Sequence, residues 1–208
     1  MDSSEFEFAP VEGAWGALDL VVADALAAEG WCVTDQLLDP LLITELYEEV
    51  LGRDDLMAAK VGRHHQQRAQ DDVRRDKTGW LQGESPAQAR YIERMESLRM
   101  LMNRRLFLGL QEYEAHFARF DSGDFYRTHV DALKGQRNRM VTCVTYLNPH
   151  WRPEWGGQLV LYDGQGAELT RVQPKGGVSV LFLSEEFPHQ VLPARTSRYS
   201  IAGWFRVR

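Results

Sequence analysis

The sequence has few cysteines, no long apolar run and no excess of positive charge. Its two cysteines, Cys32 and Cys143, lie far apart in apolar stretches, and no CxxC pair is present. This excludes a zinc ribbon and a thioredoxin-type redox site, and predicts two buried free thiols in a reducing compartment. No apolar run approaches the roughly 20 residues that a membrane-spanning helix requires, so we expect no membrane partner.

The first ten residues also lack the features of a signal peptide. They carry three acidic side chains, and no basic cluster precedes an apolar run. We therefore expect a cytoplasmic protein. The formal net charge of −6 gives no support for a nucleic-acid partner. Hydrophobic residues make up 44% of the 208 residues, which is enough for one domain over 1–208 with a proper core.

The first 110 residues show the marks of helices. Apolar residues recur at helical spacing over 18–26, before Gly30. The pairs Asp39-Pro40 and Ser85-Pro86 each place a capping residue before a proline suited to the first helical position. They predict one helix over 41–51 and another from Pro86 towards Phe107, ending by Gly109.

The segment between these two helices is rich in Arg, Gln, Asp and Gly and poor in apolar residues. A polar stretch of this length inside a compact domain is typical of a lid, a binding loop or disorder. We expect a mobile loop at about 60–80. It either closes over a substrate or stays a solvated loop without a binding role.

After about residue 111 the pattern changes to short strands separated by turn residues. A strong strand is predicted over 140–147. Further strands are predicted over 157–162, 169–172, 178–183, 189–192 and 199–207. Many short strands at such intervals indicate a sandwich or barrel, so we expect an α+β protein with helices first and a β-rich body second.

A metal site is suggested by His129 and Asp131. In an extended chain, residues two apart point to the same side, so an imidazole and a carboxylate can reach one ion. A second imidazole from a neighbouring strand, that of His189, would complete a 2-His-1-carboxylate triad. That ligand set leaves adjacent positions open and is typical of non-haem Fe(II) oxygenases.

Arg198 stands early in the predicted last strand and needs an anionic partner. A guanidinium binds a carboxylate through two parallel hydrogen bonds, and 2-oxoglutarate offers such a carboxylate at its distal end. Each of these residues has a plain structural alternative: a surface or core histidine, a turn aspartate, an edge-strand arginine. Together, in this order, they indicate an iron and 2-oxoglutarate site.

Several motifs together resemble the prolyl 4-hydroxylase branch of the 2-oxoglutarate oxygenases. The stretch 119–131 resembles the iron-binding strand of that branch. The stretch 75–80 resembles the motif after the mobile active-site loop of the egg-laying-nine type, which includes the hypoxia-inducible-factor prolyl hydroxylases and bacterial relatives. The other motifs lie at 146–148, 155–159, 188–191 and 198–204.

The resemblance runs from about Gly30 to Trp204 and implies a double-stranded β-helix, or jelly roll. Residues 111–208 would form the jelly-roll core, and residues 1–110 would be mainly helical support with the mobile loop.

The resemblance also implies roles for individual residues. His129, Asp131 and His189 match the iron ligands, and Arg198 and Tyr146 match the residues that hold 2-oxoglutarate. Phe120 departs from the pattern, because several relatives have a cofactor-binding tyrosine near this position. The residues that match a substrate pocket are Tyr126, Leu159, Trp204 and Arg75.

The resemblance implies a dioxygenase that uses Fe(II), 2-oxoglutarate and O₂, with ascorbate as a supporting reductant. We expect it to hydroxylate a prolyl residue in a protein substrate, for instance a translation factor, with succinate and CO₂ as co-products and a link to oxygen sensing. It would act as a monomer or weak oligomer.

Two other functions stay open: a hydroxylase of a free amino acid or small metabolite, and a non-catalytic iron-binding sensing module. The presence of Asp131 and Arg198 argues against the module, and Asp131 also argues against a halogenase.

Overall fold

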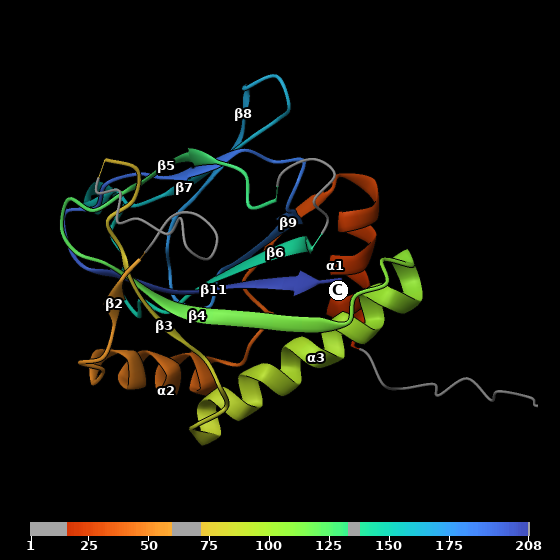
Figure 1. The fold of residues 1–208 in the computed structure, drawn as a ribbon, viewed down its shortest axis with the longest axis horizontal. Helices are drawn as coiled ribbons and strands as arrows, with labels where there is room; N and C mark the ends of the chain where they lie inside the picture. Colours follow the sequence, from red (N-terminus) through yellow and green to blue (C-terminus); the bar gives the residue numbers. More distant parts are fainter. Residues whose placement is uncertain (1–15, 60–71, 133–137, 208) are drawn as a thin grey trace, which may run out of the picture.

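The computed structural model describes residues 16–59, 72–132 and 138–207, which form three α-helices, a short 3₁₀-helix and two antiparallel sheets (Figure 1). The elements in chain order are α1 (Ala17–Ala28), β1 (Trp31–Thr34), α2 (Pro40–Leu51), β2 (Met57–Ala58), β3 (Lys77–Trp80), α3 (Pro86–Leu106), β4 (Glu112–Phe120), β5 (Tyr126–His129), β6 (Arg139–Tyr146), η2 (Pro153–Trp155), β7 (Leu159–Tyr162), β8 (Glu168–Val172), β9 (Ser179–Leu183), β10 (His189–Val191) and β11 (Arg198–Arg206).

The helices α2 and α3 begin where the capping pairs predict. The Asp39 carboxylate accepts a hydrogen bond from the Leu42 amide at 2.9 Å, and the Ser85 hydroxyl accepts one from the Gln88 amide at 3.0 Å. These bonds satisfy amides that have no partner inside the helix. The helix α3 ends at Leu106, one residue before the Phe107 towards which it was predicted to run, because Phe107 takes the left-handed conformation with φ of 55°.

A seven-stranded sheet has the order β1-β9-β6-β11-β4-β3-β2, and a four-stranded sheet has the order β5-β10-β7-β8. The central strand β11 pairs with β4 along its whole length and with β6 on its other side. In the smaller sheet, β10 lies between β5 and β7 and places His189 directly opposite His129. The two sheets agree with the predicted β-rich body.

The helices cover one face of the seven-stranded sheet, and the four-stranded sheet lies on the side away from them (Figure 1). The larger apolar core joins helix residues such as Leu46, Met95 and Leu98 to sheet residues such as Phe117 and Ile201. A second, smaller apolar cluster holds the sheets together. The sheet is therefore packed on both faces, with chemically different neighbours on each.

The end of the expected mobile loop is a strand. Residues Lys77–Trp80 form β3, which pairs with β4 on one side and with Met57–Ala58 on the other. The loop prediction was therefore wrong for 77–80, because the hydrogen bonds that fix this polar strand come from distant partners. Residues 60–71 of that loop prediction lie outside the described residues.

Cys32 and Cys143 are both free thiols, as predicted, but only Cys143 is fully buried. Burial raises the pKa of Cys32 to about 11 and that of Cys143 to about 12. Both thiols are therefore protonated and unreactive at neutral pH. Among the described helices, none is long and apolar enough to cross a membrane.

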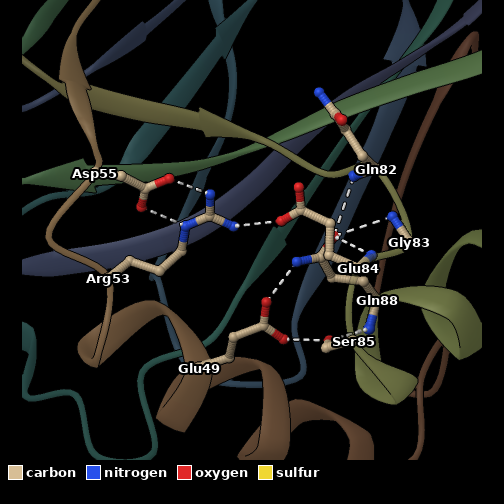
Figure 2. A network of polar contacts seen from close by, with 8 residues as sticks. All are labelled: Glu49, Arg53, Asp55, Gln82, Gly83, Glu84, Ser85 and Gln88. Atoms are coloured by element: carbon tan, nitrogen blue, oxygen red, sulfur yellow. Dashed lines mark hydrogen bonds and ion pairs between the residues drawn. The ribbon is translucent and has the colours of Figure 1, made fainter.

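A polar network joins the end of α2 to the loop before α3 (Figure 2). The Gln88 side-chain oxygen accepts hydrogen bonds from the backbone amides of residues 82–84, and its nitrogen donates to Glu49. Arg53 binds Asp55 through two hydrogen bonds, of 2.8 and 2.6 Å. Because Arg53 and Asp55 line the cavity that also contains His129 and His189, this network fixes part of the cavity rim.

Candidate metal centre

Three side chains converge as the sequence predicts. His129 ends β5, His189 begins the adjacent β10, and Asp131 follows two residues after His129. Each offers one ligand atom, and these atoms lie within 4.8 Å of one another. The Asp131 carboxylate lies 3.4 Å from His129 Nε2 and 3.8 Å from His189 Nε2. One cation can therefore contact all three.

Both imidazoles direct Nε2 to the place where the three ligand atoms converge. His129 Nδ1 lies 2.8 Å from the Arg127 carbonyl oxygen, and His189 Nδ1 lies 3.2 Å from that of Phe187. A carbonyl only accepts, so each Nδ1 carries the proton and each Nε2 keeps its lone pair for a metal. Burial lowers the pKa of His189 to about 4, which keeps this imidazole neutral at physiological pH, as metal binding requires.

The carboxylate of Asp131 is held in its ionised form. Burial opposes its ionisation, but the neighbouring histidines and the hydrogen bond from Trp204 keep its pKa well below the ordinary value. Its Oδ2 accepts hydrogen bonds from Thr142 Oγ1 at 2.8 Å and from Trp204 Nε1 at 2.9 Å. A carboxylate with two imidazoles is a ligand set suited to Fe(II).

Arg198 is a buried cation that lacks an anion. Its side chain is 1% exposed, and its guanidinium carbon lies 4.9 Å from the ring centroids of both Phe120 and Tyr146. Within the described part of the chain, no carboxylate forms an ion pair with it, and neither its Nε nor the Tyr146 hydroxyl has a hydrogen-bond partner. A buried unpaired charge is costly, so this pocket fits an anionic ligand such as the distal carboxylate of 2-oxoglutarate.

A cavity of about 640 Å³ connects the triad with Arg198. This volume lies within the range typical of small-molecule sites. Three of the residues predicted for a substrate pocket line this cavity: Tyr126, Leu159 and Trp204. Tyr146 is fully buried and lies behind the lining, beside Arg198.

The prediction for Arg75 does not fit this cavity. The cavity lining includes Arg74 and Asp76, whereas the Arg75 guanidinium lies 5.0 Å from the ring centroid of Phe125. Successive residues of an extended segment point to opposite sides, so the inward positions here are 74 and 76. A role for Arg75 in a substrate pocket stays a prediction.

Arg74 also lines the cavity and was not among the predicted pocket residues. It binds the buried carboxylate of Asp76 through two hydrogen bonds, and its guanidinium lies 4.4 Å from the ring centroid of Tyr126. Tyr126 in turn stacks on His129, with centroids 3.5 Å apart and planes 16° from parallel. The run of charged residues at 74–76 was the available signal.

Comparison with known proteins agrees with this geometry. Residues 115–206 match the family model described as the 2OG-Fe(II) oxygenase superfamily. The crystal structure of a Pseudomonas putida prolyl-4-hydroxylase has a TM-score of 0.83 and 39% identity, covering 91% of this chain and 99% of that one. A Trichoplax adhaerens prolyl hydroxylase, solved with a hypoxia inducible factor peptide fragment, has a TM-score of 0.80 and 26% identity, covering 91% of this chain and 89% of that one.

Among curated proteins, Egl nine homolog 1 from Homo sapiens is 30% identical over 200 residues, which cover 91% of this chain and 46% of that protein. The same protein from Rattus norvegicus is also 30% identical, with 58% of it covered. The chain spans about half the length of these curated relatives. With the family match, the nearly complete coverage of the Pseudomonas putida structure and the converging triad, the chain belongs to the 2OG-Fe(II) oxygenase superfamily, whose members require Fe(II), 2-oxoglutarate and O₂, and its relatives are prolyl hydroxylases.

Proposed function

We propose that this protein is a dioxygenase that hydroxylates a prolyl residue in a protein substrate. The observation that carries the proposal is the convergence of His129, Asp131 and His189 in one cavity with Arg198, a buried cation without an anion among the described residues. Both halves of the required cofactor set, an iron and a dicarboxylate, have matching side chains in this cavity.

In this proposal, Nε2 of His129, Nε2 of His189 and the Asp131 carboxylate hold the iron. Arg198 and the Tyr146 hydroxyl hold the distal carboxylate of 2-oxoglutarate. When bound, iron and 2-oxoglutarate supply the oxidation of a C–H bond by O₂, with succinate and CO₂ as co-products. The backbone carbonyls that accept from each Nδ1 keep both imidazoles oriented.

The substrate side of the cavity favours a peptide over a free amino acid. Tyr126, Leu159 and Trp204 give it apolar walls near the triad, which suit a pyrrolidine ring. The lining then continues outward to Met57 and Trp80, which are 71% and 49% exposed. A free proline would leave this outer part empty, whereas a peptide chain can lie along it. The Trichoplax adhaerens relative was solved with such a peptide.

We further propose that the two sheets are the halves of a double-stranded β-helix. The jelly-roll core would span 111–208, and α1, α2 and α3 would support it. The packing of these helices against the outer face of the larger sheet supports the assignment. A cytoplasmic location, a monomer or weak oligomer, a link to oxygen sensing and support by ascorbate remain predictions.

The test is a turnover assay with Fe(II), 2-oxoglutarate and O₂ and three alternative substrates: proline-containing peptides from translation factors, the same peptides with alanine for proline, and free proline. We expect hydroxylated proline in the first set, measured by mass spectrometry, with about one succinate released per hydroxyl group. If only free proline were hydroxylated, the proposal of a protein substrate would be wrong, and the substrate would be a small metabolite. If the protein bound metal but released no succinate under any condition, the proposed enzymatic activity would be contradicted. A non-catalytic iron-binding sensing module would then be the remaining function.

A further inference from the structure

The two oxygens of Asp131 have different surroundings. Oδ2 accepts two hydrogen bonds, from Thr142 Oγ1 and from Trp204 Nε1. Oδ1 lies 3.4 Å from His129 Nε2, whereas Oδ2 lies farther from the nearest imidazole, at 3.8 Å from His189 Nε2. A carboxylate oxygen offers two acceptor sites, so both sites of Oδ2 are filled by protein donors. Only Oδ1 keeps free lone pairs for a cation.

A chain of hydroxyl groups fixes one of these donors. Thr142 Oγ1 also lies 2.8 Å from Ser184 Oγ, and both residues are almost fully buried. Because the carboxylate of Asp131 only accepts, the single hydroxyl proton of Thr142 goes to Asp131. Ser184 must therefore donate to Thr142, which gives the direction Ser184 to Thr142 to Asp131.

The second donor is fixed from the opposite side. The Arg139 guanidinium carbon lies 3.6 Å from the ring centroid of Trp204, and Arg139 is itself paired with Glu114 at 2.9 Å. A cation over the indole face attracts the ring and holds its plane. The indole N–H is thereby kept on Oδ2.

We propose that Thr142 and Trp204 are positioning residues that make Asp131 bind iron through Oδ1 alone. The inference rests on the proposed iron centre. An octahedral ion with three protein ligands has three open positions, of which a chelating 2-oxo acid takes two and O₂ needs the third. If Oδ2 also reached the ion, Asp131 would take that third position. The two donors therefore keep one position open.

The test counts metal-bound water without turnover. Mn(II) is bound to the protein with 2-oxoglutarate under nitrogen, and the paramagnetic relaxation of water protons reports the waters on the metal. We expect one bound water in the wild type. In the double variant T142V/W204F we expect loss of this relaxation contribution, because a freed Oδ2 replaces the water. The single variant T142V, which is nearly isosteric, should lose at least half of it.

The conservative variant T142S keeps the hydroxyl group but lacks the methyl group of threonine, and it should show the wild-type relaxation. If lost packing were the cause of the change in T142V, T142S would not show the wild-type relaxation. Thermal unfolding of each metal-free variant checks that it folds, and T142V serves alone if the double variant does not. Wild-type relaxation in T142V would overturn this inference and leave the iron centre standing. A wild type that binds no Mn(II) would overturn the iron centre and this inference with it.

Discussion

The two faces of the seven-stranded sheet differ in chemistry, although alternate side chains of the same strands supply both. On β11, Ile201 and Phe205 pack against the helices, whereas Arg198, Ser200 and Trp204 line the cavity. Successive side chains of a strand point to opposite faces, so one strand serves both sides. Residues that pack the apolar core and residues that line the candidate site are therefore neighbours in the sequence of one strand.

The strand β6 repeats this division. Val141 and Cys143 belong to the helix-side core, whereas Thr142 and Val144 line the cavity. Buried apolar groups stabilise a fold, while buried polar groups stabilise it only when they are paired. The helix side should therefore carry the stability, and the cavity side should carry ligand binding at little benefit to the fold. Five experiments test this division of roles between the two sides.

The largest effect is expected from D131N on the cavity side. The change keeps the shape but removes the anionic ligand, so succinate formation should fall by more than the roughly 10–100-fold typical of residues around a metal ligand. The melting temperature of the metal-free protein should fall little or rise, because a buried charge is removed. Activity near the wild-type level would contradict the assignment of Asp131 as a ligand.

A large effect is also expected from R198M. Removal of one member of a buried ion pair typically costs about 2–5 kcal/mol, so the affinity for 2-oxoglutarate should fall by roughly 30-fold or more. Calorimetry on the Mn(II)-loaded protein measures this affinity directly. R198K should recover part of it, because Lys keeps the charge without the planar fork. Equal affinities in all three proteins would place the dicarboxylate elsewhere.

On the helix side, M95A should destabilise the protein by about 2–5 kcal/mol, the range for truncation of a buried methionine. Met95 is fully buried in α3. Met100 lies on the same helix and is 49% exposed, so M100A is the matched control and should stay within about 0.5 kcal/mol. Urea unfolding gives the free energies. The affinity for 2-oxoglutarate should be unchanged in both variants.

The buried His116 on the cavity side should make stability depend on pH. Burial lowers its pKa to about 4, against an ordinary value of 6.5. Between these values the unfolded chain binds a proton that the folded protein does not, so stability is complete above pH 6.5 and falls as the pH drops towards 4. The loss is about 3 kcal/mol at most.

The variant H116F should remove this part of the pH dependence. Urea unfolding of the metal-free protein at pH 7.5 and pH 4.5 measures it. His189 has a similarly lowered pKa and should leave a second, comparable loss in the variant. Identical pH dependence in wild type and H116F would contradict burial of a neutral His116.

The smallest effect is expected from D39A at the start of α2. It removes the hydrogen bond to the Leu42 amide and should cost about 1 kcal/mol of stability. Turnover should not change, because the cap lies outside the cavity lining. Asp35 is exposed and gives the matched control D35A, expected to stay within about 0.5 kcal/mol. A cost below that of the control would mean that the cap adds nothing.

Local signals were enough to predict the helix starts and the metal triad. The pairs Asp39-Pro40 and Ser85-Pro86 act within one turn of their own helices, and the side-by-side placement of His129 and Asp131 follows from strand geometry. Register could not be predicted. The polar strand β3 is fixed by partners about 40 residues away. Arg74, which points into the cavity, pairs with the likewise distant Tyr126.

The residues around Asp131 were missed for the same reason. Thr142 is eleven residues from Asp131 in the chain, and Ser184 is 42 residues from Thr142. In the sequence, Thr142 is one polar residue in an apolar strand, and Ser184 is an ordinary turn residue. Only the pairing of β6 with β9 brings these hydroxyl groups together.

The most direct test of the proposed iron and 2-oxoglutarate sites is a crystal structure of the protein with Mn(II) and 2-oxoglutarate under nitrogen. We expect one metal ion bonded to His129 Nε2, His189 Nε2 and Asp131, with the distal carboxylate of 2-oxoglutarate on Arg198. A metal ion bound elsewhere, or an Arg198 that stays without the carboxylate when 2-oxoglutarate is bound, would contradict this expectation.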